Sequence, residues 1–300
     1  MAAALGGAAA LIRIVARGLF SGSRDEAKAA RLFGFRALLA PRTAFIWAGH
    51  VEANRAALGA PTTPARVLGK PLRSYLMRGL SPTDRLDALL RHGRAAERLL
   101  GSEALAGLIA GEGFTIARLE ARKGSVYRLE LAPSDKHTTQ REGEWVFAIS
   151  KVGDDALLAK LTLALAGPAG SPVVGGLQGP QSGHKRKVIE ATRELHGLRP
   201  KDATVLAVRA FARALGCEPV HAVKDANHVL AEAQGGQKFS SYDAYWLERG
   251  AEPDAAFGFR FAPLRGEADG DARGRLKRRI VEGVEAFVAA HRRLNGTHKP

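Results

Sequence analysis

The sequence predicts an α+β protein: a helical N-terminal region, residues 1–110, followed by a mixed, mainly antiparallel sheet with helices, residues 111–300. In the first region apolar residues recur every three or four positions, as they do on one face of a helix. After Gly111 and Gly113 they alternate with polar residues, which is the period of a strand. The content of 46% apolar and 25% charged residues is typical of a folded globular chain.

Four helices are expected in the N-terminal region. In the first, an apolar stripe runs from Leu11 to Leu19 while the arginines lie mostly on other sides, and Pro41 ends the pattern. A later helix starts at Ser81 and Pro82, because serine caps helices and proline fits the first helical position. The four expected helices cover residues 11–40, 43–60, 81–100 and 102–110.

Five strands are expected next, and successive strands of this kind form a mostly antiparallel sheet. Gly124 lies between the first two as turn material, so these two strands form a hairpin. The five expected strands cover residues 114–119, 126–131, 145–149, 158–165 and 172–177.

The remaining segment alternates between helices and strands. A helix from about residue 184 to 196 is followed by Gly197, a natural C-terminal cap, and a second helix begins at Pro200 and ends at Gly216. The last expected elements are a strand at 219–223, a short helix near 240–247, a strand at 257–261 and a helix at 275–294.

The net charge of +15 is concentrated near the N-terminus. Residues 1–100 carry 16 Lys/Arg and 6 Asp/Glu, hence +10, whereas the other two thirds carry +2 and +3. A basic region of this kind suits an anionic membrane surface or an acidic protein partner, and a solvated arginine-rich surface is the simpler alternative. Nucleic acid is an unlikely partner, because no binding module is present and 6% aromatic residues leave few platforms for stacking.

The sequence also suggests a cellular location. Cys217 is the only cysteine, so neither an internal disulfide nor a multi-cysteine zinc site can form. The apolar start precedes Arg13 and Arg17, whereas a secretory signal has its positive charge first. The sequence contains no stretch of about 18 uncharged apolar residues, so no membrane-spanning helix is expected. We therefore expect a cytoplasmic protein, with peripheral attachment to the inner membrane as an extension of that prediction.

Standard catalytic motifs are absent from the sequence. It contains no His-Glu-x-x-His metal motif, dinucleotide fingerprint, phosphate loop or nucleophile elbow. The nine histidines are scattered, so no metal site is expected, and Cys217 is expected to be a buried small apolar residue rather than a nucleophile.

Residues 174–250 carry the most distinctive motifs. They include the runs Leu177–Pro180 and His196–Lys201, and the runs Arg141–Glu144 and Lys70–Leu76 lie upstream. Single residues that fit the same pattern are Thr192, Ala222, Val223, Asn227, His228, Lys238, Tyr242, Asp243, Trp246 and Gly250. With these motifs the chain resembles, over about residues 30–295, the VirK/YbjX family of bacterial proteins, which is centred on a domain of unknown function.

The resemblance implies a role but no reaction. Members of the family are associated with virulence, surface-protein display and envelope or antimicrobial-peptide stress in Gram-negative bacteria. Whether the chain is an enzyme stays open at this point.

The order of the elements is also similar to that of the acetyltransferase (GNAT) fold, in which coenzyme A lies where two strands part and its pyrophosphate rests on a helix start. Backbone N–H groups and the helix dipole favour an anion at such a start. We therefore expect an acyl-CoA-like or phosphate-bearing ligand, with coenzyme A or an acyl carrier as cofactor, at residues 178–187. An ordinary loop before a solvated basic helix is the alternative. The candidate ligand-binding residues are Gln178, Gly179, Gly183, Lys185, His196, Arg199 and Lys201.

An acyltransferase-like enzyme needs a general base to take a proton from an acceptor hydroxyl or amine. Glu144, His228 and Tyr242 are the candidates for catalysis. Each has a structural alternative: Glu144 as a solvent-facing strand residue, and the other two as packed side chains. The competing hypothesis for the whole chain is a non-enzymatic envelope factor that docks on a membrane or a partner through its basic N-terminal third.

Overall fold

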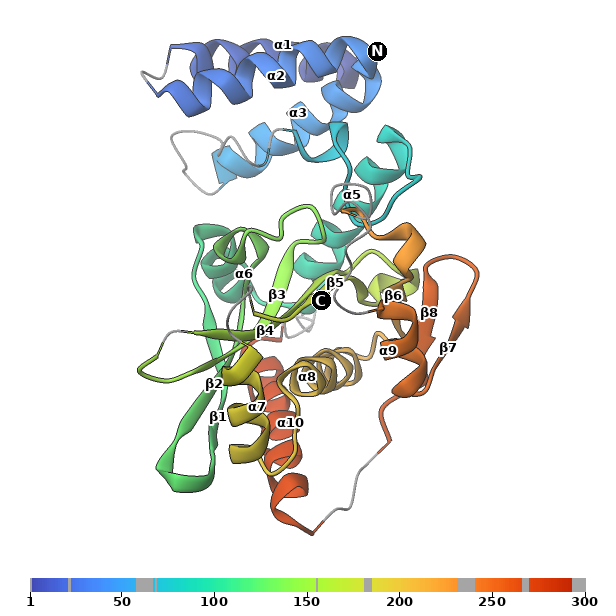
Figure 1. Ribbon diagram of the computed structural model, residues 1–300. Helices are drawn as coiled ribbons and strands as arrows, with labels where there is room; N and C mark the ends of the chain where they lie inside the picture. Colours follow the sequence, from blue (N-terminus) through green and yellow to red (C-terminus); the bar gives the residue numbers. More distant parts are fainter. Residues whose placement is uncertain are drawn as a thin grey trace, which may run out of the picture. The chain divides into compact units, whose positions relative to one another are not determined.

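The computed structural model describes residues 2–20, 23–57, 67, 69–154, 156–180, 185–230, 241–265 and 270–292. The chain forms two compact units, Met1–Leu90 and Arg91–Pro300, and each is described by itself. Figure 1 shows helices in the first unit and a sheet with helices in the second, so the predicted α+β class is confirmed. The domain boundary expected after residue 110 stays a prediction.

The N-terminal unit begins with three helices, α1 (Ala2–Leu19), α2 (Arg24–Leu39) and α3 (Pro41–Ala57). The expectation of one helix over residues 11–40 is wrong, because the chain leaves the helix after Leu19 and starts a new one at Arg24. Ser23 causes the restart: its backbone is extended and its hydroxyl accepts a hydrogen bond from the Glu26 amide at 3.4 Å.

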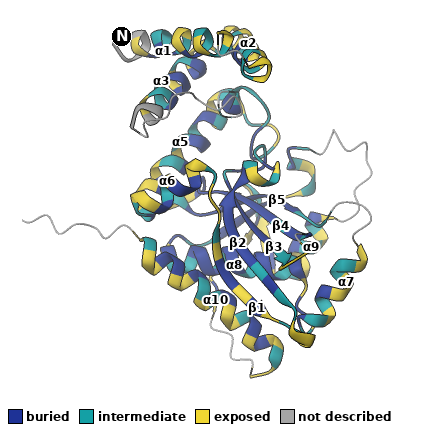
Figure 2. Ribbon diagram, turned by 90° about the vertical axis from the view of Figure 1, so that its left-hand side faces the viewer, coloured by how far each residue is buried: buried dark blue, intermediate teal, exposed yellow. Residues whose placement is uncertain are grey.

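Small residues let these helices approach closely. A Cβ at Gly7 of α1 would lie 2.5 Å from the Phe45 carbonyl oxygen of α3, and a Cβ at Gly18 would lie 2.5 Å from the Ala30 Cβ of α2. The predicted apolar stripe of α1 is not the buried side of the helix: Ile12 and Leu19 are 67% and 41% exposed, and Leu11 and Val15 are half-buried. The buried position is Ile14, which is 4% exposed. Figure 2 shows the resulting alternation of buried and exposed positions along α1 and α2.

Two further helices, α5 (Pro82–Leu99) and α6 (Ser102–Ala110), lie close to their predicted bounds. The predicted start at Ser81 is confirmed, because the Ser81 hydroxyl accepts from the Asp84 amide while the Asp84 carboxylate accepts from the Ser81 amide. This reciprocal bonding is the capping-box arrangement. A short 3-10 helix, η1 (Lys70–Leu72), precedes α5.

The second unit contains an eight-stranded sheet with the order β1-β2-β3-β4-β5-β6-β8-β7. All neighbouring strands are antiparallel except β5 and β6, so the predicted mixed sheet is confirmed. The sequence missed β7, because Ala251–Asp254 contains a proline and two acids and shows no apolar alternation. The strands are β1 (Phe114–Glu120), β2 (Val126–Pro133), β3 (Trp145–Lys151), β4 (Leu157–Ala164), β5 (Val173–Gln178), β6 (Val220–Val223), β7 (Ala251–Asp254) and β8 (Gly258–Phe261).

The helices of this unit lie close to their predicted bounds. Gly216 ends α8 in the left-handed region with φ of 69°, as a C-terminal glycine should. The helices that follow the first strands in the described residues are α7 (Lys185–Glu194), α8 (Pro200–Leu215), α9 (Tyr242–Glu248) and α10 (Ala272–His291). Four 3-10 helices also occur: η2 (Arg122–Gly124), η3 (Ser134–His137), η4 (Pro168–Gly170) and η5 (Asp225–Asn227).

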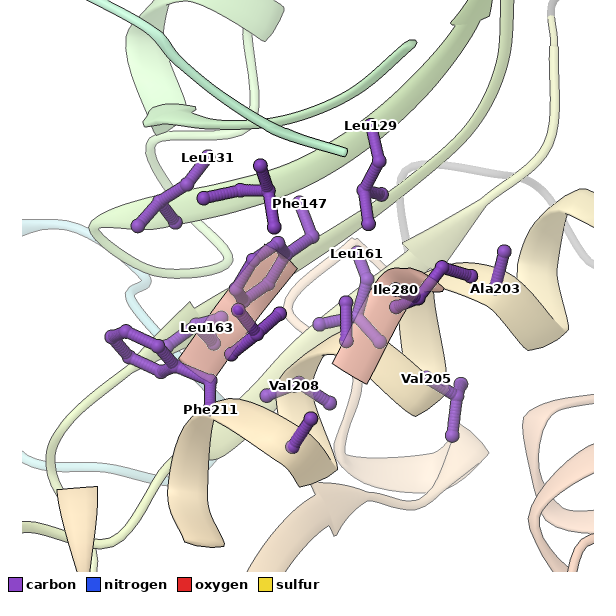
Figure 3. Close-up of a cluster of buried hydrophobic side chains, with 14 of the residues drawn as sticks. Leu129, Leu131, Phe147, Leu161, Leu163, Ala203, Val205, Val208, Phe211 and Ile280 are labelled. Atoms are coloured by element: carbon purple, nitrogen blue, oxygen red, sulfur yellow. The ribbon is translucent and has the colours of Figure 1, made fainter. Parts of the chain in front are cut away.

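The main hydrophobic core lies between one face of the sheet and helices α8 and α10. Figure 3 shows leucine and phenylalanine side chains of β2–β4 meeting Phe211 and Val208 of α8 and Ile280 of α10. The sheet residues labelled in this cluster are Leu129, Leu131, Phe147, Leu161 and Leu163, all 0% exposed. Since neighbouring residues of a strand point to opposite faces, the residues between them form a second face.

Candidate functional site

The second face of the sheet is small and polar where the first is large and apolar. The strand register places on it Glu130, Ala132, Val146, Ala148, Lys160, Thr162, Gly176 and Gln178. The connection between β2 and β3, residues 134–144, folds over this face, and Ser134 and Thr139 in it are buried. Lys160 holds the connection by donating a hydrogen bond to the His137 carbonyl oxygen at 2.8 Å.

Glu142 lies in that connection and is only 1% exposed. Its Oε1 accepts a hydrogen bond from Gln178 Nε2 at 2.5 Å, whereas its Oε2 accepts none from any residue in the described ranges. The carboxylate occupies the space that a Cβ at Gly176 would need, so any side chain at position 176 would have to displace Glu142. A buried carboxylate oxygen without a partner is costly, and such groups mark candidate functional positions.

His228 faces the same carboxylate. Its Nε2 lies 3.4 Å from Glu142 Oε1, and the side chain is 2% exposed. The Leu230 amide donates to His228 Nδ1 at 3.3 Å, so a neutral ring carries its proton on Nε2, toward Glu142. The ring meets Tyr242 edge-on with centroids 5.1 Å apart. We call Glu142, Gln178, His228 and Tyr242 the Glu142 cluster.

The Glu142 cluster lies where the two parallel strands part. β5 and β6 pair only through Val173 with His221 and Val174 with Ala222. Beyond that point α9 supplies partners for both strands: the Tyr242 hydroxyl accepts from the Leu177 amide at 3.1 Å, and Trp246 Nε1 donates to the Val223 carbonyl at 3.0 Å. Burial raises the pKa of Tyr242, so its hydroxyl stays protonated at neutral pH.

A charged group lies next to these two side chains of α9, where the Tyr245 ring meets Trp246 edge-on with centroids 5.2 Å apart. Asp202 Oδ1 accepts from the Tyr245 hydroxyl and from Arg249 Nε, both at 2.7 Å, and the Arg249 guanidinium stacks on the Tyr245 ring at 3.8 Å. Lys201 Nζ lies 5.8 Å from the centre of the same ring. Burial, together with the positive charge of Arg249, lowers the pKa of Lys201.

The structure brings some predicted site residues together. Gln178, His228 and Tyr242 meet in the Glu142 cluster. Gly179 approaches Lys201, since a Cβ at Gly179 would lie 3.8 Å from Lys201 Cε.

Other predicted site residues have partners elsewhere. His196 Nδ1 accepts from Arg122 Nε at 3.1 Å, and Arg199 Nη1 lies 3.7 Å from Glu248 Oε1 on the surface. Lys185 is the exposed first residue of α7. The Glu144 backbone bonds to Leu163 and Ser134, at the start of β3. Gly183 lies outside the described residues.

Sequence reasoning missed Glu142 as a candidate. Both Glu142 and Glu144 stand in the distinctive run Arg141–Glu144, but the alternation that identifies inward residues begins only with β3 at Trp145. The missing signal was Gly176, whose lack of a side chain leaves room for one carboxylate. That relation joins a residue of β5 to a residue of the β2–β3 connection, 34 positions earlier in the sequence, so a single sequence does not reveal it.

Several other features bear on possible chemistry. Cys217 is buried, which confirms the expectation, and this burial raises the pKa of its thiol to about 12. Within the described ranges, no three His, Cys, Asp or Glu side chains gather closely enough to hold a metal ion. Among the helices the structure describes, none is both long and apolar enough to cross a membrane.

Comparison with known proteins gives a family for this chain. Residues 22–268 match the model of the family described as "Protein of unknown function (DUF535)". The Escherichia coli K12 protein "Uncharacterized protein YbjX" is 27% identical over 239 residues, which cover 76% of this chain and 70% of that protein. No solved structure matches.

Proposed function

Because the chain belongs to the YbjX/VirK family, DUF535, whose function is not known, we propose its function from the Glu142 cluster: an acyltransferase-like enzyme. The donor is an acyl thioester of coenzyme A or of an acyl carrier. The acceptor is a hydroxyl or an amine.

The observation that carries the proposal is the buried pair of Glu142 and His228. One carboxylate oxygen is held by Gln178 and faces the imidazole at 3.4 Å, and the other accepts no hydrogen bond within the described part of the chain. A buried carboxylate beside an imidazole is a proton-transfer pair. Oε2 is buried against Gly176 and has no hydrogen-bond partner in the described ranges, so it is the oxygen that would take the proton of an acceptor that enters the site.

The proposed reaction balances through this pair. The acceptor oxygen or nitrogen attacks the thioester carbonyl, and its proton passes to the Glu142–His228 pair. The attack forms a new carbon–oxygen or carbon–nitrogen bond, and the carbon–sulfur bond of the thioester then breaks. The thiolate leaves and takes up the proton that the pair received. No oxidant or metal is required.

The position of the donor is supported by the strand topology. A parallel pair that parts after two residue pairs, followed by a segment leading to a basic helix start at Lys185, is the arrangement expected of a GNAT-like donor site. Lys201, beside Gly179, adds positive charge next to this segment. Tyr242 and Trp246 now fill the divergence, so a pantetheine arm between the strands has to displace the Tyr242 hydroxyl from the Leu177 amide.

Titration calorimetry with acetyl-coenzyme A and with acyl-acyl-carrier protein tests the proposal. Wild type is expected to bind one of them, and Glu142→Gln and His228→Asn are expected to bind it with similar affinity but to lose at least about 100-fold in transfer rate. Glu252→Gln is the matched control, because Glu252 is an exposed carboxylate of β7. Absence of binding at millimolar concentration would rule the proposal out.

A second candidate function is a non-enzymatic envelope factor that docks on an anionic membrane or an acidic partner. Its support is the charge of +10 in residues 1–100 together with exposed apolar side chains on the first two helices. Liposome flotation of the full chain and of a version starting near Ala40 tests it, since equal behaviour removes the N-terminal anchor. A cytoplasmic location and a role in virulence or envelope stress stay predictions under both candidates.

A further inference from the structure

Helix α2 presents an unusual apolar surface. Leu32, Phe35, Leu38 and Leu39 are 43%, 65%, 77% and 77% exposed, respectively. At 100° per residue these four side chains share an arc of about 120°. We call them the α2 apolar face. Exposed large apolar residues that occur singly need no explanation, but four on one face mark an interaction site.

The fold of the N-terminal unit does not use this face. The buried residues of α2 are Ala30, Phe33 and Ala37, which lie on the opposite side of the helix. α1 packs against α2 at Gly18 and Ala30, and Gly34 faces Val15. The α2 apolar face is therefore a surface that the bundle leaves open rather than part of its core.

The charges on the same arc identify the kind of partner. Arg24, Lys28 and Arg31 lie within this arc, in the first half of the helix, and are exposed. The acidic residues of α2, Asp25 and Glu26, are both in its first turn. The outer side of α2 is thus basic in its first half and apolar in its second half.

We propose that the α2 apolar face docks on an anionic membrane surface, with Phe35, Leu38 and Leu39 entering the interface and Lys28 and Arg31 resting on the headgroups. Large apolar side chains and Lys/Arg on one helix are the composition of an interfacial helix. This inference rests on the second candidate function and is independent of acyl transfer.

A second copy of the chain fits the face less well. If two α2 helices paired antiparallel through this side, the basic half of one would cover the apolar half of the other and bury positive charge against leucine and phenylalanine. If they paired parallel, the two basic halves would face each other and repel.

Flotation of the full-length protein with vesicles tests the proposal. One vesicle is phosphatidylcholine alone, and the other contains phosphatidylglycerol as well. We expect binding to the anionic vesicle, weaker binding as salt is raised, and a roughly tenfold or greater loss of affinity in Phe35→Gln/Leu38→Gln. The matched control, Ile109→Gln/Leu247→Gln, changes exposed apolar residues elsewhere and is expected to bind like wild type.

A second pair of variants separates charge from apolar contact. Lys28→Gln/Arg31→Gln is expected to lose binding to the anionic vesicle, whereas Lys123→Gln/Arg279→Gln, which removes the same charge from exposed positions of the sheet unit, is expected to retain more of it.

Three outcomes overturn the proposal: no binding of wild type to anionic vesicles, unchanged binding of Phe35→Gln/Leu38→Gln, or a wild-type dimer that this variant dissociates. Circular dichroism of each variant confirms that the helices remain folded. If the second candidate function is right but this face is wrong, truncation to Ala40 still abolishes flotation while Phe35→Gln/Leu38→Gln does not.

Discussion

The two faces of the sheet differ in the kind of side chain that they bury. On the face toward α8 and α10, Phe147 and Leu161 are fully buried among other apolar side chains. On the face beneath the β2–β3 connection, Glu142 and Thr162 are as deeply buried, yet each has a polar atom without a hydrogen-bond partner in the described ranges.

The difference shows which face carries stability and which is a candidate for function. Burial of an unpaired polar atom destabilises the folded state, whereas burial of an apolar side chain stabilises it. The Glu142 cluster destabilises the fold, and yet residues of four separate segments meet in it. Such a combination is a sign of a functional site. The variants below test whether the two faces differ as expected.

The largest effect is expected on the apolar face. Phe211 of α8 lies edge-on to Phe147 at 5.7 Å and is fully buried. Phe211→Ala leaves a cavity and is expected to lower the free energy of unfolding by about 3–5 kcal/mol. Urea unfolding followed by circular dichroism measures it. Leu247→Ala, at a position 54% exposed, is the control and should change stability by less than about 0.5 kcal/mol.

The next effect concerns the close approach of Glu142 to β5. Gly176→Ala puts a methyl group into the space of the Glu142 carboxylate, and we expect a loss of about 1–3 kcal/mol. In a Glu142→Ala background the same change should cost much less, because the carboxylate is gone. Equal costs in both backgrounds would show that the two residues do not compete for space.

A smaller effect is expected at the divergence of β5 and β6. Tyr242→Phe removes the acceptor of the Leu177 amide, which is buried, and should cost about 1–2 kcal/mol. Hydrogen exchange at the Leu177 amide should become faster by the corresponding factor. Unchanged exchange would mean that another acceptor replaces the hydroxyl.

The smallest effect is a pH dependence at His221, which points to the polar face. Burial lowers the pKa of His221, Asp254 opposes this and Arg260 adds to it. A histidine with a lowered folded pKa binds its proton more readily in the unfolded chain. The stability that the neutral His221 contributes to the folded state is therefore fully present above the unfolded pKa of about 6.5. This stability is lost as the pH falls below that value. The pH dependence of unfolding should be weaker in His221→Gln, and identical profiles would contradict this.

Elements with a clear period were predictable from sequence, and relations between distant segments were not. The alternation in Val126–Leu131 and the caps at Ser81 and Gly216 identify β2, α5 and α8, because their signals are local. The restart at Ser23 was also local but was overlooked. At the site, His228 and Tyr242 were identified by type and motif, whereas Glu142 required knowledge of what faces Gly176.

The indole of Trp246 makes the divergence of β5 and β6 observable by light. It is fully buried, and its N–H is bonded to the last residue of β6. The chain has two other tryptophans, Trp47 and Trp145, which a single-tryptophan variant replaces with phenylalanine. In such a single-tryptophan protein, any molecule that parts the two strands shifts the indole toward water, and its emission moves to longer wavelength. The fold thus contains its own optical reporter of occupancy, without an attached dye.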